Sequence, residues 1–268
     1  MQGFGIQADW LSKGLVQIGL SEEALGEYMK ANVTESADMM PIEDYFKLFE
    51  WAATTLNEPH MGLKLAQNIN IDDLGLLAYV SKNSATLGDL ANTLERYQSI
   101  FMIGFAISNH VDNELSEVRY QVMRPYSDGV RQDIEFSIGL LVKNIPKVLG
   151  RKLPLRVNFS HSIVGSMEAY TEIFAAQVHF DQPNNSIVFD ASWLEFPISN
   201  SDPRLLKLLQ EQADKALSES EGKHDFLTQV RFLITACLGD DSYSLEVLSQ
   251  QLNISTRTLL RRLKKYDY

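Results

Sequence analysis

The 268-residue sequence predicts an α+β fold, in which a mixed helical and antiparallel-sheet domain is followed by a small all-α element. Apolar residues in the first hundred positions recur at the three-to-four spacing of amphipathic helices. The next ninety or so residues contain short apolar or alternating segments separated by turn residues, a pattern typical of antiparallel hairpins. Residues 244–265 have the pattern of two short helices joined by a tight turn.

The N-terminal part is expected to be mainly helical. The segments with the clearest helical spacing are Trp10–Ile18, Glu22–Lys30, Ile42–Leu56 and His60–Asn68. Pro41 and Pro59 mark the starts of the last two. Asp72–Ser81 contains a glycine and is expected to bend into a buried helix or a short strand, after which Thr86 caps a helix from Leu87 to about Ser99.

Strands and helices are mixed after residue 100. A continuous apolar run and an alternating segment, separated by turn residues, predict a first hairpin, and two shorter segments around residues 181–185 predict a second. The predicted strands are Phe101–Ser108, Glu114–Arg124, Leu155–Phe159, Val178–Phe180 and Ser186–Phe189. The predicted helices are Val130–Leu149, Ala169–Ala176, Pro203–Leu217 and Asp225–Leu238.

A polar segment at residues 218–224 is the predicted domain boundary. It contains Gly222 between serine, glutamate, lysine and histidine residues, a composition typical of a linker. We therefore expect a domain over residues 1–222 and a second, smaller element over residues 223–268.

The C-terminal element has the features of a helix-turn-helix. Ser244 and Ser255 are suitable N-caps for its two helices, and Asn253 tolerates the left-handed backbone of a tight turn. On the second helix Leu259 and Leu263 face inward. The opposite face carries Arg257, Leu260, Arg261 and Lys264, with Lys265 beside them. An apolar back and an arginine-rich front suit the DNA major groove, although a basic helix alone is more often a solvated surface.

Charge is distributed unevenly along the chain. The net charge is −11, which argues against indiscriminate nucleic-acid binding. Residues 1–220 contain 17 lysines and arginines against 29 acidic residues, whereas residues 255–268 contain five basic residues against one acidic residue. An acidic body with a basic tip is expected when only the tip approaches phosphate.

The C-terminal motif resembles the first helix-turn-helix of AraC/XylS-type transcription regulators. The matching positions are Leu245, Leu248, Leu252, Ile254, Ser255, Arg257, Thr258, Leu259, Arg261 and Leu263. Ser249 stands where the family usually has alanine. The resemblance implies that Arg257, Leu260 and Arg261 face bases and that Lys264 and Lys265 face phosphates. Family DNA-binding domains carry two such motifs, and this chain is expected to be truncated after the first.

The body is similar to the arabinose-binding-type sensor domain of one branch of AraC regulators. The similarity rests on three blocks of sequence: residues 57–64, residues 78–90, and the segment from His161 to Leu206. A sensor followed by this motif is the family's arrangement. It implies a bacterial regulator that responds to a small-molecule effector, which the arabinose label does not identify.

Several chemical functions find no support in the sequence. The chain lacks His-Glu-x-x-His, a phosphate-binding loop with Gly-Lys-Ser/Thr, and Gly-x-Ser-x-Gly, so we expect no enzyme, cofactor or metal site. A single cysteine, Cys237, excludes an internal disulfide and fits a cytoplasmic protein. No apolar stretch approaches about 20 residues, so no membrane association is expected.

A ligand pocket is expected near the strand-rich centre. Polar residues available to orient a small ligand are Tyr120, Arg124, Arg131, Glu135, His161 and Tyr170, although a structural role is more common for each. Among these, His161 and Tyr170 are the predicted ligand-binding residues, because they fall inside the block that resembles the sensor domain.

Two functions remain open from the sequence. The first is a ligand-responsive, DNA-binding transcription regulator, expected to form a homodimer because two-fold assemblies are commonest. The alternative is an interaction and dimerisation protein that senses a small molecule and pairs with a full-length regulator without contacting DNA.

Overall fold

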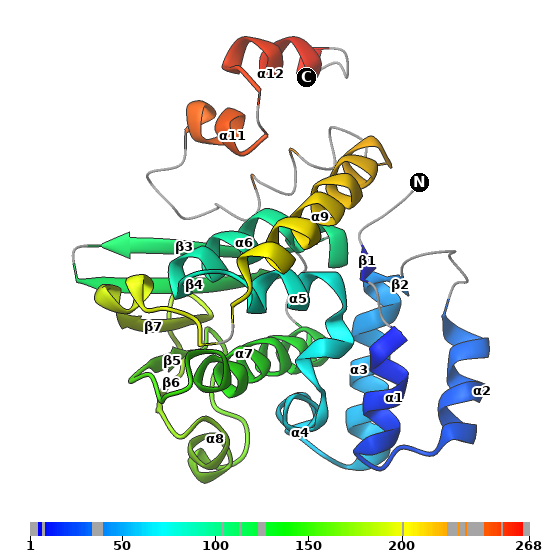
Figure 1. Cartoon of the computed structure of the whole chain (residues 1–268). Helices are drawn as coiled ribbons and strands as arrows, with labels where there is room; N and C mark the ends of the chain where they lie inside the picture. Colours follow the sequence, from blue (N-terminus) through cyan, green and yellow to red (C-terminus); the bar gives the residue numbers. More distant parts are fainter. Residues whose placement is uncertain are drawn as a thin grey trace.

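A computed structural model describes residues 5–6, 9–33, 40–102, 104–112, 114–122, 127–199, 201–223, 230, 234, 244–252 and 254–264. The predicted α+β class is confirmed (Figure 1). Arg124, Cys237, Asn253 and Lys265 lie outside the described residues, as does almost all of the predicted helix Asp225–Leu238.

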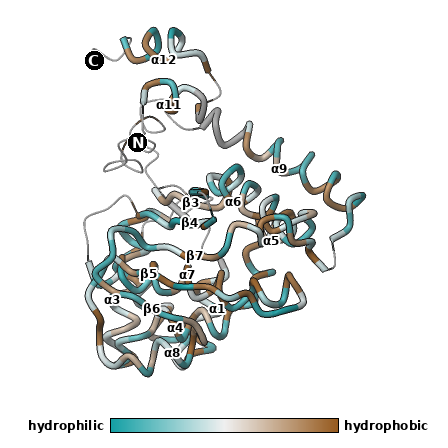
Figure 2. Tube along the Cα trace, turned by 90° about the vertical axis from the view of Figure 1, so that its left-hand side faces the viewer, coloured by the Kyte–Doolittle hydropathy of each residue, from teal (hydrophilic) through white to brown (hydrophobic). Residues whose placement is uncertain are grey.

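The helices agree closely with the amphipathic segments of the sequence. They are α1 (Asp9–Gln17), α2 (Glu22–Asn32), α3 (Ile42–Leu56), α4 (Met61–Asn68), η1 (Ile71–Leu74), α5 (Leu76–Lys82), α6 (Leu87–Phe101), α7 (Asp128–Leu149), α8 (Met167–Phe174), η2 (Ala191–Glu195), α9 (Pro203–Lys223), α11 (Leu245–Gln251) and α12 (Thr256–Leu263). Figure 2 shows apolar and polar residues alternating along α9, as expected of an amphipathic helix.

Two sheets organise the strands. The strands are β1 (Gly5–Ile6), β2 (Met40–Pro41), β3 (Phe105–Asp112), β4 (Leu115–Val122), β5 (Arg156–Asn158), β6 (Gln177–His179) and β7 (Ser186–Asp190). β1 and β2 form a small antiparallel pair, and the main sheet has the order β3-β4-β7-β5-β6. The predicted first hairpin is confirmed, because β3 pairs antiparallel with β4.

The predicted second hairpin is wrong. β6 and β7 do not pair with each other, because β5 lies between them, parallel to β6 and antiparallel to β7. Val157, at the centre of β5, is fully buried and pairs with Val178 on one side and Ile187 on the other. The connection between β6 and β7 is anchored at the end of β5, where the Asn185 side chain accepts hydrogen bonds from Ser160 N and Oγ.

One strand boundary also differs from its prediction. The apolar run Phe101–Ser108 was expected to be strand throughout, but Phe101 is the last residue of α6 and the strand begins at Phe105. Gly104 has a φ of 99°, a backbone conformation that side-chain-bearing residues rarely adopt, and it separates the two elements. The Gln98 side chain on α6 donates a hydrogen bond to the C=O of Ile107 and accepts one from its N–H. The helix therefore provides partners for the backbone groups of one residue on the edge strand β3.

Helix α7 is the central element of the body. Two glycines allow close packing around it. A Cβ at Gly129 would lie 2.2 Å from the Phe46 carbonyl oxygen on α3, and a Cβ at Gly62 on α4 would lie 2.0 Å from the Gln132 carbonyl oxygen. Residues 129–136 of α7 are all buried, including the polar residues Arg131, Gln132, Asp133 and Glu135.

Candidate functional site

An apolar pocket lies between α7 and the helices that cover it. Residues from α1, α3, η1, α5, α6, β3 and β4 line the remaining walls. The lining includes the aromatic residues Trp10, Tyr45, Phe101, Tyr120 and Phe136. Concave, mainly apolar pockets with a few polar groups are typical of small-molecule sites.

The main polar group of this pocket is Asp133. Its side chain is buried, with a residue exposure of 1%. Tyr45 on α3 donates a hydrogen bond from its hydroxyl to Oδ1 at 2.7 Å, and Tyr120 on β4 donates one to Oδ2 at 2.8 Å. Three elements distant in sequence therefore hold this carboxyl group in place. Among the polar pocket residues that were considered from the sequence and that the structure describes, only Tyr120 lies here.

The protonation of Asp133 is set mainly by burial. Burial raises the pKa of this carboxyl group from its usual 3.8 to about 7, and the two tyrosine hydrogen bonds oppose the change. The pKa of each tyrosine is raised in turn, first by burial and then by the nearby Asp133 charge. Lys82 also lines the pocket, but its Nζ lies 2.6 Å from Asp72 Oδ1 in a half-exposed ion pair.

Sequence reasoning missed Asp133 although a signal was present. The residues of α7 that line the pocket include Asp133, Ser137, Leu140, Leu141 and Asn144, which recur every three or four positions along one helix face. Small polar residues placed at intervals within an otherwise apolar stripe are unusual for a simple core face. This pattern would have indicated a pocket wall.

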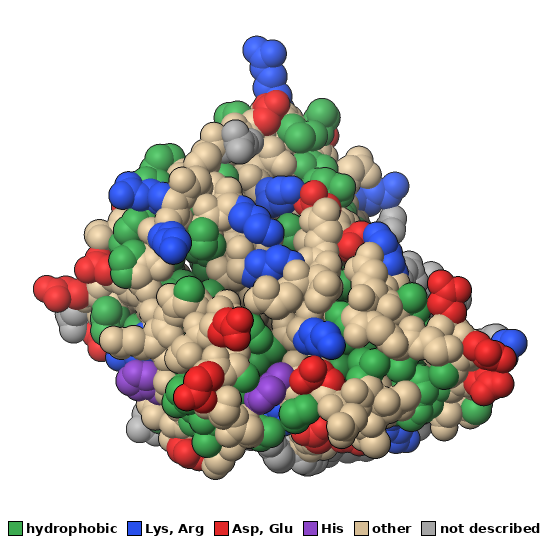
Figure 3. Space-filling model, turned by 90° about the horizontal axis from the view of Figure 1, so that it is seen from below, with side chains coloured by type: hydrophobic (Ala, Val, Ile, Leu, Met, Phe, Trp, Pro, Cys, Tyr) green, Lys and Arg blue, Asp and Glu red, His purple; other side chains and the backbone are tan. Residues whose placement is uncertain are grey.

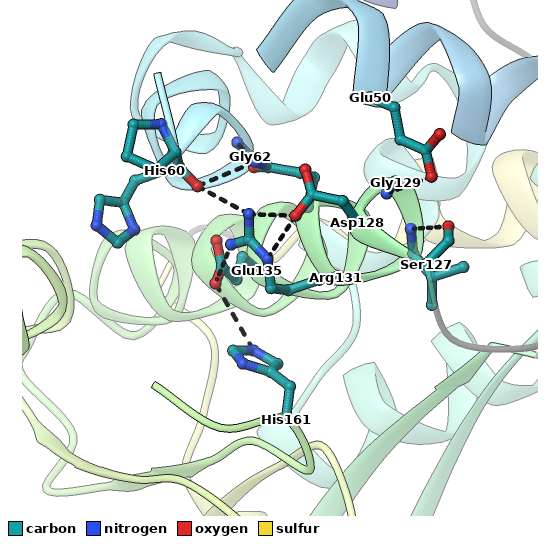
Figure 4. Close-up of polar contacts among 12 residues, drawn as sticks. Glu50, His60, Gly62, Ser127, Asp128, Gly129, Arg131, Glu135 and His161 are labelled. Atoms are coloured by element: carbon teal, nitrogen blue, oxygen red, sulfur yellow. Dashed lines mark hydrogen bonds and ion pairs between the residues drawn. The ribbon is translucent and has the colours of Figure 1, made fainter. Parts of the chain in front are cut away.

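The predicted ligand residues His161 and Tyr170 converge on a different group, the carboxylate of Glu135. Figure 4 shows His161 pointing toward this carboxylate. The Tyr170 hydroxyl donates to Glu135 Oε1 at 2.7 Å, and His161 Nε2 lies 3.6 Å from the same oxygen. Arg131 Nη1 contacts it at 2.8 Å. The four residues form the Glu135 cluster, which does not line the apolar pocket.

Other elements anchor the Glu135 cluster. Arg131 Nη2 also donates to Asp128 Oδ1 at 2.7 Å and to the Pro59 carbonyl oxygen at 2.9 Å, so this guanidinium links α7 to the segment before α4 (Figure 4). His161 Nδ1 lies 2.9 Å from the Ser162 carbonyl oxygen, which can only accept, so Nδ1 carries a proton. Burial lowers the pKa of His161, and the imidazole is therefore neutral at pH 7.

Polar atoms without a hydrogen-bond partner gather around this cluster. They include Glu135 Oε2, His161 Nε2 and His60 Nδ1. Buried groups of this kind usually bond an ordered water. Burial also raises the pKa of Glu135 to about 7, with Arg131 and Tyr170 opposing the change. The geometry identifies a buried polar network, and a role in ligand binding for His161 and Tyr170 stays a prediction.

Helices α11 and α12, orange and red in Figure 1, share a small apolar core of their own. Val230, Leu248 and Leu259 are buried in it, and Leu259 is fully inaccessible. The predicted caps are present, since Ser244 Oγ accepts from Val247 N and Ser255 Oγ accepts from Thr258 N. The unusual Ser249 lies at the helix crossing, where its hydroxyl donates to the Glu246 carbonyl oxygen and lies 3.2 Å from Thr256 Oγ1.

The predicted DNA-contacting side chains that the structure describes are all exposed. They are Arg257, Leu260, Arg261 and Lys264. Leu260 retains 46% of its surface, which is high for a leucine on a helix that has an apolar core to pack against. The structure therefore separates α12 into a buried leucine face and an exposed, mainly basic face.

Other surfaces and residue groups offer less chemistry. Figure 3 shows acidic, basic and apolar side chains interspersed on the face of the molecule seen from below. Across the described ranges, no group of three or more histidine, cysteine, aspartate or glutamate side chains is arranged to hold a metal ion. None of the helices that the structure describes is both long enough and apolar enough to cross a membrane.

Comparison with known proteins gives consistent results. Residues 19–198 match the family described as the arabinose-binding domain of AraC transcription regulator, N-terminal. The chain is 25% identical to the ornithine utilization regulator of Pseudomonas aeruginosa over 253 residues, which are 93% of this chain and 74% of that protein. It is 26% identical to the HTH-type transcriptional regulator VirS of Mycobacterium tuberculosis over 227 residues, which are 84% of this chain and 66% of that protein.

A solved structure shares the fold. The crystal structure of transcriptional regulator CdpR from Pseudomonas aeruginosa superposes with a TM-score of 0.56, covering 97% of this chain and 80% of that chain. Because the sequence identity is 17%, this likeness concerns the fold alone.

Proposed function

This chain belongs to the AraC-type transcription regulators that carry an arabinose-binding N-terminal domain, and we propose that it is a ligand-responsive, DNA-binding regulator. The observation that supports DNA binding is that helix α12 has a buried face and a basic face. Leu259 is buried, and Arg257, Arg261 and Lys264 are exposed. A helix of this kind fits the major groove, where an arginine can donate two hydrogen bonds to guanine.

The effector site in this proposal is the apolar pocket beside α7. It lies within the part of the chain that matches the sensor family, and its walls come from elements spread from α1 to α7. A ligand that contacts so many elements can change how they pack against one another. The side chains of the Glu135 cluster, by contrast, bond to one another and do not line this pocket. We propose no catalytic role for either group.

The DNA-contacting face is tested by two substitutions on α12. Arg261→Ala should cost about 1–3 kcal/mol of binding to preferred duplexes and relax the preference at one base pair. Lys264→Ala should lower affinity for all duplexes evenly and reduce the salt dependence, because it removes a phosphate contact. The measurement is fluorescence anisotropy with the full chain, using duplexes first selected from a random pool.

Glu246→Ala is a suitable control, because Glu246 is an exposed residue in the first turn of α11 and does not belong to the basic face of α12. It should leave sequence preference unchanged. Equal effects of Arg261→Ala and Lys264→Ala on every duplex would show that the assignment of the two faces is wrong. Absence of DNA binding by the unaltered chain would favour the alternative, an interaction protein that does not contact DNA.

We also propose that residues 1–222 form the sensing and dimerisation domain. The body and the α11–α12 pair have separate apolar cores, which supports this division. Helix α9 continues to Lys223, through the predicted boundary, and its earlier part packs on α6, where Asp214 accepts hydrogen bonds from Tyr97 and Arg96.

A fragment of residues 1–222 should therefore be soluble and melt cooperatively, since it keeps the Asp214 contacts and the larger core. We expect it to have the oligomeric state of the full chain, a homodimer. Light scattering coupled to size-exclusion chromatography, together with thermal unfolding, provides the test. An aggregated fragment would place the boundary elsewhere.

A further inference from the structure

We propose that the effector of this protein is a small apolar molecule with a positively charged nitrogen, and that this nitrogen pairs with the carboxylate of Asp133. The inference rests on the proposed function, because it takes the apolar pocket as the effector site. It adds the chemical class of the ligand and the residue that would select it.

The first argument is the charge of the pocket. Asp133 is a buried carboxyl group, and its two recorded partners are both tyrosine hydroxyls. Within the described ranges, no lysine, arginine or histidine forms an ion pair with it, and no neighbouring charge contributes to the shift of its pKa. A buried carboxylate without a cation is unfavourable, and a ligand cation would supply the missing charge.

Glu135 provides a comparison within the same helix. It is equally buried, but Arg131, one turn earlier at position i−4, pairs with it at 2.8 Å. The position one turn before Asp133 is Gly129, which packs so closely against the Phe46 carbonyl oxygen that no side chain fits there. Asp133 therefore has no cation from its own helix where Glu135 has one.

The charged and titratable groups around Asp133 leave room for a ligand cation. Tyr45 from α3 and Tyr120 from β4 each occupy one carboxylate oxygen, and each oxygen can accept a further hydrogen bond. Lys82 from α5 lines the same pocket but pairs with Asp72. The other polar residues of the lining that lie on α7, Ser137 and Asn144, are uncharged.

The second argument is the character of the walls. The lining is dominated by aliphatic side chains and aromatic rings, including Trp10, Phe101 and Phe136. Such walls favour an apolar ligand body, and the faces of aromatic rings also attract cations. An anionic ligand would meet the carboxylate of Asp133, and Lys82, a positive side chain of the lining, already pairs with Asp72. The combination favours an amine with an aromatic or aliphatic body.

The experiment uses three probes with the same body and different ends: phenylbutylamine, phenylbutanol and phenylbutanoate. Binding to the full chain is measured by calorimetry and by thermal shift at pH 8. We expect the amine to bind at least about tenfold more tightly than the alcohol, a difference of about 1.4 kcal/mol, and the carboxylate to bind most weakly.

Two matched variants locate the effect. Asp133→Asn should remove the preference for the amine while keeping the shape of the pocket. Glu135→Gln alters a neighbouring buried acid that does not line the pocket and should keep the preference. If Asp133→Asn does not fold, the unaltered chain still provides a test, because its affinity for the amine should fall up to tenfold per pH unit below pH 7, as Asp133 becomes protonated.

Equal binding of the amine and the alcohol, or no binding of the amine, would overturn this inference. So would a preference that survives Asp133→Asn. The proposed function would stand in each case if the α12 variants alter DNA binding as expected, because that measurement uses no probe. If only the α12 variants fail to alter DNA binding as expected, the regulator proposal is overturned and the proposed pairing of a ligand amine with Asp133 still stands.

Discussion

Replacing Glu135 with alanine is expected to lower the free energy of unfolding at pH 8 by about 3–5 kcal/mol, the range for breaking a buried ion pair by removing one partner. The side chain of Arg131 is 3% exposed and would lose its contact with Glu135 Oε1, while it would keep the ion pair with Asp128, whose side chain is 52% exposed. The hydroxyl of Tyr170 would lose its recorded acceptor within the cluster. At pH 8 the carboxyl group of Glu135 is ionised, because its raised pKa is about 7.

A surface pair on the main sheet provides the control. Arg119 Nη2 lies 2.9 Å from Glu117 Oε2, with side-chain exposures of 22% and 24%. Glu117→Ala should cost about 0–1 kcal/mol, since water can replace the lost partner. Both variants are measured by chemical denaturation of the full chain. If the two variants lose similar amounts of unfolding free energy, the contacts of Glu135 do not stabilise the packing of α7 against the segment around Tyr170.

Elements with strong local signals were predicted well. Helix α3 begins and ends at the predicted residues Ile42 and Leu56, because its apolar stripe is wide and Pro41 precedes it. The caps at Thr86 and Ser255 accept the expected backbone hydrogen bonds. In each case the decisive interaction joins residues within a few positions of one another, so the sequence alone contains the information.

Elements decided by distant contacts were predicted less well. β6 and β7 are adjacent in sequence and separated by turn residues, yet β5 lies between them in the sheet. The three-residue β5 has no periodicity of its own that would reveal this position. Its place depends on burying Val157 between two neighbours, which is a property of the whole sheet.

The candidate site shows the same division. Sequence resemblance directed attention to His161 and Tyr170, and the structure brings them to one carboxylate, together with Arg131 and Glu135. The carboxyl group that lines the pocket belongs to Asp133, two residues away on the same helix. Residues two apart on a helix point to different sides, so only the packing of α7 reveals which acid lines the pocket. The exposed face of α12, by contrast, follows directly from helical spacing.

The stability of the protein without ligand should fall as pH rises from about 4 to about 7, and Asp133 should cause a large part of this fall. In the folded protein its carboxyl group has a pKa raised to about 7 from the usual 3.8. Between these values the folded state holds a proton that the unfolded state has released. The contribution is therefore fully present at low pH and is lost as pH increases, at up to about 1.4 kcal/mol per pH unit.

Comparison of the unaltered chain with Asp133→Asn isolates this contribution. The amide does not titrate, and the other titratable groups contribute equally to the pH dependence of both chains. Relative to the variant, the unaltered chain should be more stable at pH 5 than at pH 8 by about 2–3 kcal/mol. Chemical denaturation across this range measures the difference. A constant difference would mean that Asp133 has an ordinary pKa in the folded protein. A cation already paired with the carboxylate would have that effect, and the pocket would then have no unmatched charge to offer a ligand.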